Sequence, residues 1–190
     1  MNAGAWLEEI RDQYRYRKDQ CERAIAQVDE AKWFVPIGCI PLGLAAQMKH
    51  LGGNHRSRWR DFLTTDGEKR DRNRDQEFVV EGETAESIRA IWDEGWRITF
   101  ETLDSLGPDD LEKRVTIRGE PLTVAQAIQR NLTHLAYHTG QIVSLAIHHA
   151  GDSWQSLSVP VGESEAYNAR MRERFGDWWA REGDAEPPDG

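Results

Sequence analysis

The sequence has few of the features that mark secreted, membrane or redox proteins. Its 190 residues include two cysteines, Cys21 and Cys39, and no CxxC spacing, which excludes a disulfide framework and leads us to expect reduced thiols. No apolar run approaches the roughly 20 residues that a membrane span requires. Residues 1–7 lack the basic start and apolar centre of a signal peptide. We therefore expect a cytoplasmic protein without a membrane partner.

Positive charge is also scarce, because 33 acidic residues outnumber 24 lysines and arginines and give a formal net charge of −9. Nucleic acids and anionic membranes would be repelled by this excess. The composition therefore excludes a general nucleic-acid-binding role, and a small molecule is the partner that we expect.

Amphipathic helices account for most of what the sequence does contain. Hydrophobic residues make up 38% of the chain and charged residues 30%, in a length that suits one domain with a substantial core. Apolar positions recur at helical spacing in four long segments and one shorter segment, and a strand-and-turn pattern occupies residues 115–122. These patterns predict helices over residues 5–28, 42–63, 84–106, 121–150 and 163–181, with Thr84 as the N-cap of the third.

The expected fold is all-α, a four-helix bundle with an additional C-terminal helix and at most a short β-hairpin. We expect a single domain over residues 1–181 and a disordered acidic tail over residues 182–190. Residues 64–78 are densely charged, and their apolar residues do not recur at helical or strand spacing. Their simplest interpretation is a solvated surface loop, and the alternative is that Arg72 or Arg74 faces an anionic substrate.

Two histidines carry the clearest chemical pattern. His134 and His138 are four residues apart in the helix predicted over residues 121–150, so they lie one turn apart on the same face. Two imidazoles in this arrangement can reach one metal ion at roughly 2.0–2.1 Å. The same spacing also arises by chance, in which case the rings only pack or hydrogen-bond against a neighbouring helix.

A third metal ligand has to come from another part of the chain. The helix predicted over residues 42–63 offers two histidines, His50 on the flank of its apolar stripe and His55 at the centre. A histidine at the centre of an apolar face is more often a core residue, which favours a structural role for His55. Periodicity alone does not choose between them.

Several short motifs give the chain a resemblance to a known family. Residues 48–51, which contain His50, and residues 134–142 are similar to the histidine motifs of the DinB/YfiT-like superfamily. Residues 58–68 and 157–160 resemble one of its uncharacterised branches, a domain of unknown function. The resemblance covers most of the chain, from about Trp6 to Asn168.

The resemblance implies a four-helix bundle in which three histidines meet at one divalent metal. Matched position by position, the ligands are His50, His134 and His138. Characterised members of the superfamily are metal-dependent transferases and isomerases that use low-molecular-weight thiols such as mycothiol or bacillithiol, and many are dimers. The resemblance therefore implies a homodimeric, metal-dependent thiol S-transferase that acts on small electrophilic molecules, with the thiol as co-substrate.

Three neutral imidazoles leave an open coordination position, which is typical of catalytic zinc sites. A metal of this kind lowers the pKa of a bound thiol or water, so a metal-dependent hydrolase is the first alternative to thiol transfer. The others are a non-catalytic metal-binding bundle and a purely structural bundle. Imidazole ligands suit zinc, nickel, copper and iron, of which we expect zinc or nickel.

The candidates for substrate binding near the ligands are Asn54, Arg58, Arg130 and Gln141.

Overall fold

The computed structural model describes residues 2–38 and 42–176, so Cys39 and the predicted tail over residues 182–190 lie outside the described residues. The chain divides into two compact units, Met1–Trp154 and Gln155–Gly190. The expectation of one domain over residues 1–181 stays a prediction. No helix in the described ranges is long and apolar enough to cross a membrane.

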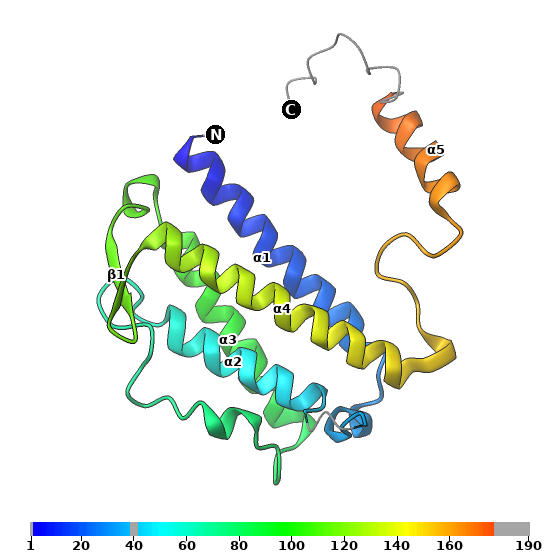
Figure 1. Ribbon diagram of the computed structural model, residues 1–190, viewed down its shortest axis with the longest axis horizontal. Coiled ribbons are helices and arrows are strands. Elements are labelled where there is room, and N and C mark those ends of the chain that lie inside the picture. The colour runs from blue at the N-terminus through cyan, green and yellow to red at the C-terminus, as the bar shows by residue number, and fades with distance from the viewer. Residues whose placement is uncertain (1, 39–41, 177–190) are drawn as a thin grey trace. The chain divides into compact units, whose positions relative to one another are not determined.

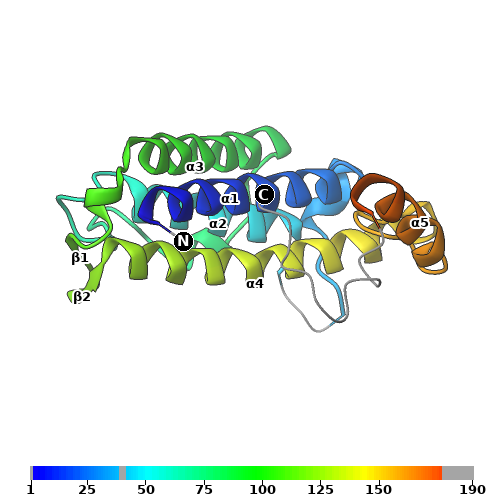
Figure 2. The same cartoon turned by 90° about the horizontal axis from the view of Figure 1, so that it is seen from above.

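Four long helices form the first unit and confirm the predicted all-α fold. They are α1 (Ala3–Ile25), α2 (Leu44–Trp59), α3 (Ala85–Ser105) and α4 (Val124–Ala150), and they run alongside one another (Figures 1 and 2). Helix α2 packs against both α3 and α4, and α1 packs against α4. Large buried side chains fill the core. They include Tyr14, Trp33, Trp59 and Trp96.

The second unit contains α5 (Ser164–Phe175), the additional helix predicted over residues 163–181. It follows an irregular segment, and no residue of α5 is buried. The last part of the predicted helix, residues 177–181, lies outside the described residues.

A short antiparallel hairpin precedes α4, formed by β1 (Arg114–Ile117) and β2 (Glu120–Thr123). Both turn residues, Arg118 and Gly119, have positive φ values of 56° and 75°, as the tight turn of a two-residue hairpin requires. Because residues 120–123 pair with β1, α4 begins at Val124, later than the predicted start at residue 121. Thr123 then caps the helix by accepting a hydrogen bond from the backbone of Gln126.

The charged segment over residues 64–78 lies at the surface, as its composition suggests, but it is also anchored on α2. Ser57 of α2 donates to the carbonyl of Gly67 at 3.0 Å and accepts from the backbone N–H of Lys69 at 3.0 Å. The segment ends in a 3₁₀ helix, η2 (Asp75–Phe78), that packs on α2. The side chain of Arg72 is only 5% exposed and pairs with carboxylates of the same segment. The segment is therefore a packed cover over α2.

Asp66 fastens the start of this cover to the hairpin. Its carboxylate accepts hydrogen bonds from the backbone N–H groups of Glu68, Arg118 and Gly119 at 2.7–2.8 Å. Partial burial raises the pKa of Asp66, but the hydrogen bonds from these N–H groups lower it by more than burial raises it. The net pKa of Asp66 therefore lies well below its ordinary value.

We expect Asp66→Asn to destabilise the protein at neutral pH by about 1 kcal/mol, after allowance for solvent screening, because charge-assisted hydrogen bonds are lost. The folded-state pKa is depressed, so this stability is present above the unfolded pKa of about 3.9 and is lost as the pH falls further. Urea unfolding at pH 7 and pH 3 measures the difference. A stability gap that is equally large at pH 3 would contradict this role.

Helices α2 and α3 approach closely at a pair of glycines. A Cβ atom at Gly95 would lie 2.7 Å from the Cα of Gly52, and one at Gly52 would lie 2.5 Å from the carbonyl oxygen of Ile91. Both contacts involve backbone, so neither can be relieved by rotating a side chain. The crossing fixes α2, the helix that carries His50.

We expect Gly52→Ala to destabilise the bundle by about 3 kcal/mol, since a methyl group at the crossing forces the helices apart. The matched control is Gly140→Ala in α4, where a Cβ atom would meet nothing within 4 Å. That substitution should instead add about 0.5–1 kcal/mol through helix propensity. Chemical unfolding of both variants tests the crossing, and equal effects would contradict it.

Candidate metal centre

Three histidines from two helices meet on one side of the bundle. His50 comes from α2, and His134 and His138 come from successive turns of α4. Each offers one ring nitrogen, and the three nitrogens all lie within 4.8 Å of one another. His50 and His138 are buried and His134 is half-buried, so His134 is the member of this triad closest to solvent.

The spacing of the ring nitrogens suits a small metal ion. The Nε2 atoms of His50 and His134 are 3.4 Å apart. Two nitrogens bound to one tetrahedral zinc at 2.0–2.1 Å lie ~3.3 Å apart, so this separation agrees with ligation of one ion. The ring centroid of His138 is 4.7 Å from that of His50 and 4.5 Å from that of His134.

Two oxygen acceptors fix which nitrogens face the centre. Nδ1 of His50 lies 2.8 Å from Oε2 of Glu77, and Nδ1 of His138 lies 2.8 Å from Oε1 of Gln47. Both oxygens can only accept, so each histidine donates from Nδ1. The Nε2 atom of each ring then faces the same space. Partners of this kind orient metal-binding histidines. The donor set therefore fits a divalent metal.

Glu77 is itself held by Arg72. The guanidinium of Arg72 donates to both carboxylate oxygens of Glu77 at 2.7 and 2.9 Å, and to Glu68 at 2.8 Å. Burial raises the pKa of Glu77, but the hydrogen bonds from Arg72 and His50 outweigh it, so the pKa is lowered and the group is a carboxylate at neutral pH. Arg72 thus positions the carboxylate that orients His50.

Two members of the triad, His134 and His138, are uncharged at neutral pH. Burial lowers the pKa of His134 to about 3, and the neighbouring His138 and His50 lower it further. Burial and the neighbouring His50 lower the pKa of His138 to about 4. Neutral imidazoles have the free electron pairs that a metal requires.

The structure brings His50 and not His55 to the triad. His55 is fully buried on another side of α2, where its ring makes an edge contact with Trp96 at a centroid distance of 4.6 Å. Neither of its ring nitrogens has a hydrogen-bond partner among the described residues. Burial, followed by the neighbouring His134, lowers its pKa to about 3. The apolar stripe therefore predicted the position of His55 correctly.

The four residues predicted to bind substrate have different surroundings. Asn54 is buried and accepts a hydrogen bond from Asn131 of α4 at 3.1 Å. Arg58 is half-buried and has no hydrogen-bond partner for Nη1 among the described residues. Gln141 lies beside His138 and acts to raise the pKa of that histidine, against the larger lowering by burial. Arg130 is 52% exposed and pairs with Glu120 of β2 at 2.7 Å, so nothing directs it to the triad.

Glu77 and Gln47, which orient the histidines, were not predicted from the sequence, and Arg72 was considered only as a substrate contact. Gln47 precedes His50 by three residues on α2, and that helical spacing is a signal that was available. Glu77 contacts His50 across 27 residues of sequence, and no local spacing reveals such a contact. The guanidinium of Arg72 pairs with two carboxylates, and the alternative that Arg72 or Arg74 faces a substrate stays a prediction.

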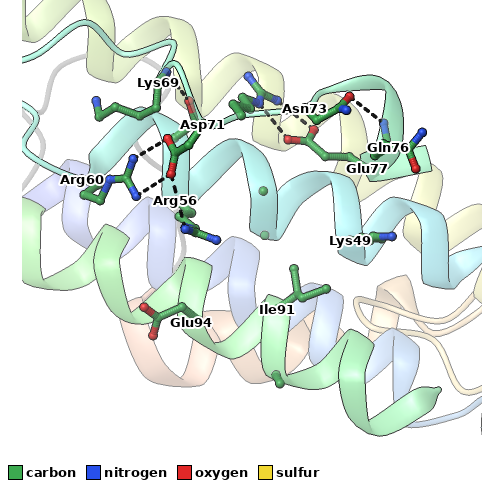
Figure 3. A pocket seen from close by; sticks show the side chains of 15 residues that line it. Lys49, Arg56, Arg60, Lys69, Asp71, Asn73, Gln76, Glu77, Ile91 and Glu94 are labelled. Carbon is green, nitrogen blue, oxygen red and sulfur yellow. Dashed lines mark hydrogen bonds and ion pairs between the residues drawn. The ribbon is translucent and has the colours of Figure 1, made fainter. Parts of the chain in front are cut away.

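Glu77 and Arg72 also line a pocket of about 410 Å³ between α2, α3 and the 69–77 segment (Figure 3). Its floor includes Gly52, Gly53 and Ile91, and its rim is charged. Most rim cations are paired: Figure 3 shows Arg60 facing Asp71, which it binds at 2.6 and 3.0 Å. The histidine triad is not part of the pocket wall, although Glu77 contacts both.

Comparison with known proteins gives one match. The model of a family described as "Protein of unknown function (DUF1572)" matches residues 2–163, a range that includes all three histidines. No curated protein and no solved structure matches the chain.

Proposed function

The chain belongs to the DUF1572 family of unknown function, and we propose from its site that it binds one divalent metal and catalyses the transfer of a low-molecular-weight thiol to a small electrophile. The main support for a metal site is that the rings of two histidines, His50 and His138, are each oriented by a hydrogen bond. Glu77 and Gln47 accept hydrogen bonds from Nδ1 of His50 and His138, so the Nε2 atoms of both rings face the space beside His134. Zinc or nickel suits this donor set.

When bound, a divalent ion with three imidazole ligands and an open position lowers the pKa of a thiol or water at that position. The chain's own residues prepare that position. Glu77 fixes the ring of His50, and Phe78 stacks on the same ring at a centroid distance of 4.5 Å. Tyr137 contacts the ring of His138 at 5.1 Å. These aromatic rings shield two of the ligands, and the half-buried His134 marks the approach for a substrate.

The resemblance of the histidine motifs to the DinB/YfiT-like superfamily supports the choice of a thiol as nucleophile. We propose that the family of this chain is a branch of that superfamily. Its support is the placement of one histidine on α2 and two on α4 of a four-helix bundle. A homodimer and a cytoplasmic location stay predictions that follow from the sequence alone.

In the proposed reaction the thiol sulfur forms a bond to an electrophilic carbon, the leaving group departs with the bonding electron pair, and the thiol proton passes to solvent. A test uses zinc- or nickel-loaded protein with cysteine or glutathione and monobromobimane, whose thiol conjugates are fluorescent. We expect conjugation above the uncatalysed rate that is lost on chelation and in His138→Ala. Metal-dependent cleavage of a carboxylic ester without any thiol requirement would instead identify the hydrolase, and metal binding without either activity would leave a metal-binding bundle.

A further inference from the structure

Arg58 has a half-buried guanidinium with no ion-pair partner among the described residues. It lies on α2 two turns after His50, and its Nη1 atom is inaccessible to solvent and has no hydrogen-bond partner in the described part of the chain. No carboxylate of the described residues lies within ion-pair distance of it. Glu68 raises its pKa from further away, but Arg72 and Arg118 already bind that carboxylate. Burial lowers the pKa of Arg58 to about 10, so it is a cation at neutral pH.

The guanidinium lies against the backbone at Gly67. A Cβ atom at position 67 would lie 2.8 Å from Nη1 of Arg58 and 3.1 Å from Cγ1 of Ile117, so the side chain passes close to this glycine. Gly67 is fixed in turn, because its N–H donates to Thr116 and its carbonyl accepts from Ser57. The bundle therefore packs around an unpaired charge, which costs stability unless something else compensates it.

Arg58 shares helix α2 with His50. Asn54 lies one turn from each of them and therefore between them along the helix. Asn54 also pairs with Asn131 of α4 at 3.1 Å. From the helical rise and the reach of its side chain, the guanidinium of Arg58 lies ~6–12 Å from the triad.

We propose that Arg58 binds an oxyanion, the carboxylate or phosphate group of the substrate, whose reacting atom lies at the triad. The planar guanidinium suits both groups because it donates two parallel hydrogen bonds. This inference rests on the proposed metal-dependent function. The substrate is then an anionic small molecule. Its charged group and its reacting atom are separated by about 6–12 Å.

The test measures the Tm of zinc-loaded and metal-free protein against acetate and inorganic phosphate at constant ionic strength, with acetamide as the neutral probe. The variants are Arg58→Met and the matched control Arg130→Met, which removes the same charge from an exposed position near the triad. We expect acetate or phosphate, but not acetamide, to raise the Tm of the wild type and of Arg130→Met. The apparent Kd from this shift should rise at least tenfold in Arg58→Met.

Without added anion, Arg58→Met should melt no lower than the wild type, since it removes an uncompensated charge. The response to acetate against phosphate distinguishes a carboxylate from a phosphate ligand. Equal anion affinity in Arg58→Met and the wild type would overturn the proposal, as would a wild type that responds to neither anion. The metal-free protein decides this question even if zinc does not bind, so the two proposals fail separately.

Discussion

Substitution of His138 by alanine is expected to abolish stoichiometric zinc binding. His138 supplies one of three nitrogens, and the two that remain cannot close a site around one ion. Loss of a partner that only orients a ligand already costs about 10–100-fold in metal affinity, and loss of the ligand itself should cost more. Competition titration against a chelator of known affinity measures the change.

The matched control is His55→Ala. It removes a buried imidazole from the same bundle, but one that faces Trp96 and lies outside the triad. We expect this variant to lose stability and to keep the zinc affinity of the wild type. Retention of zinc in His138→Ala, or an equal loss of zinc in both variants, would contradict the assignment of the ligands.

Substitution of Arg72 by methionine is expected to destabilise the protein by about 3–5 kcal/mol, because it leaves the buried carboxylate of Glu77 without its cation. Glu77 then has only His50 as a hydrogen-bond partner, so its folded-state pKa rises. In the wild type that pKa is depressed, and its contribution to stability is present above the unfolded pKa of about 4.3 and is lost as the pH falls. The destabilisation should therefore shrink toward pH 4.

Arg74→Met is the control for Arg72→Met, since Arg74 belongs to the same segment, is 51% exposed and has only a 3.9 Å pair with Asp75. We expect a change within about 1 kcal/mol, because a surface ion pair and one cation–π contact with Phe78 contribute little. Guanidinium unfolding between pH 4 and pH 8 compares the two. Similar effects of both substitutions would show that the segment is only a solvated surface.

The helices were predictable because each buries one face. Apolar residues recur at helical spacing on α1 to α4. Thr84 is the N-cap of α3, as predicted, and forms reciprocal hydrogen bonds with Ser87. The start of α4 was less predictable, since residues 121–123 suit either a helix or a strand. Pairing with β1 is a tertiary contact, and it decides the boundary there.

The site was only partly predictable, for a physical reason. His134 and His138 are neighbours within one helix, so their spacing reveals them. Glu77 and Arg72 compensate each other's charge when buried, and in the sequence such a pair looks the same as two solvated residues of a charged loop. Periodicity also left His50 and His55 as alternatives, because both lie on or beside the apolar stripe of α2. The contact of His50 with α4 separates them.

The most direct measurement is the metal content of untagged protein as purified, by elemental analysis, and again after incubation with zinc or nickel and gel filtration. The fixed nitrogens of His50 and His138 beside His134 predict about one divalent ion per chain. Fewer than about 0.1 ions per chain in both preparations would contradict a metal centre. The three histidines would then be packing residues, and the proposed enzyme would have no basis.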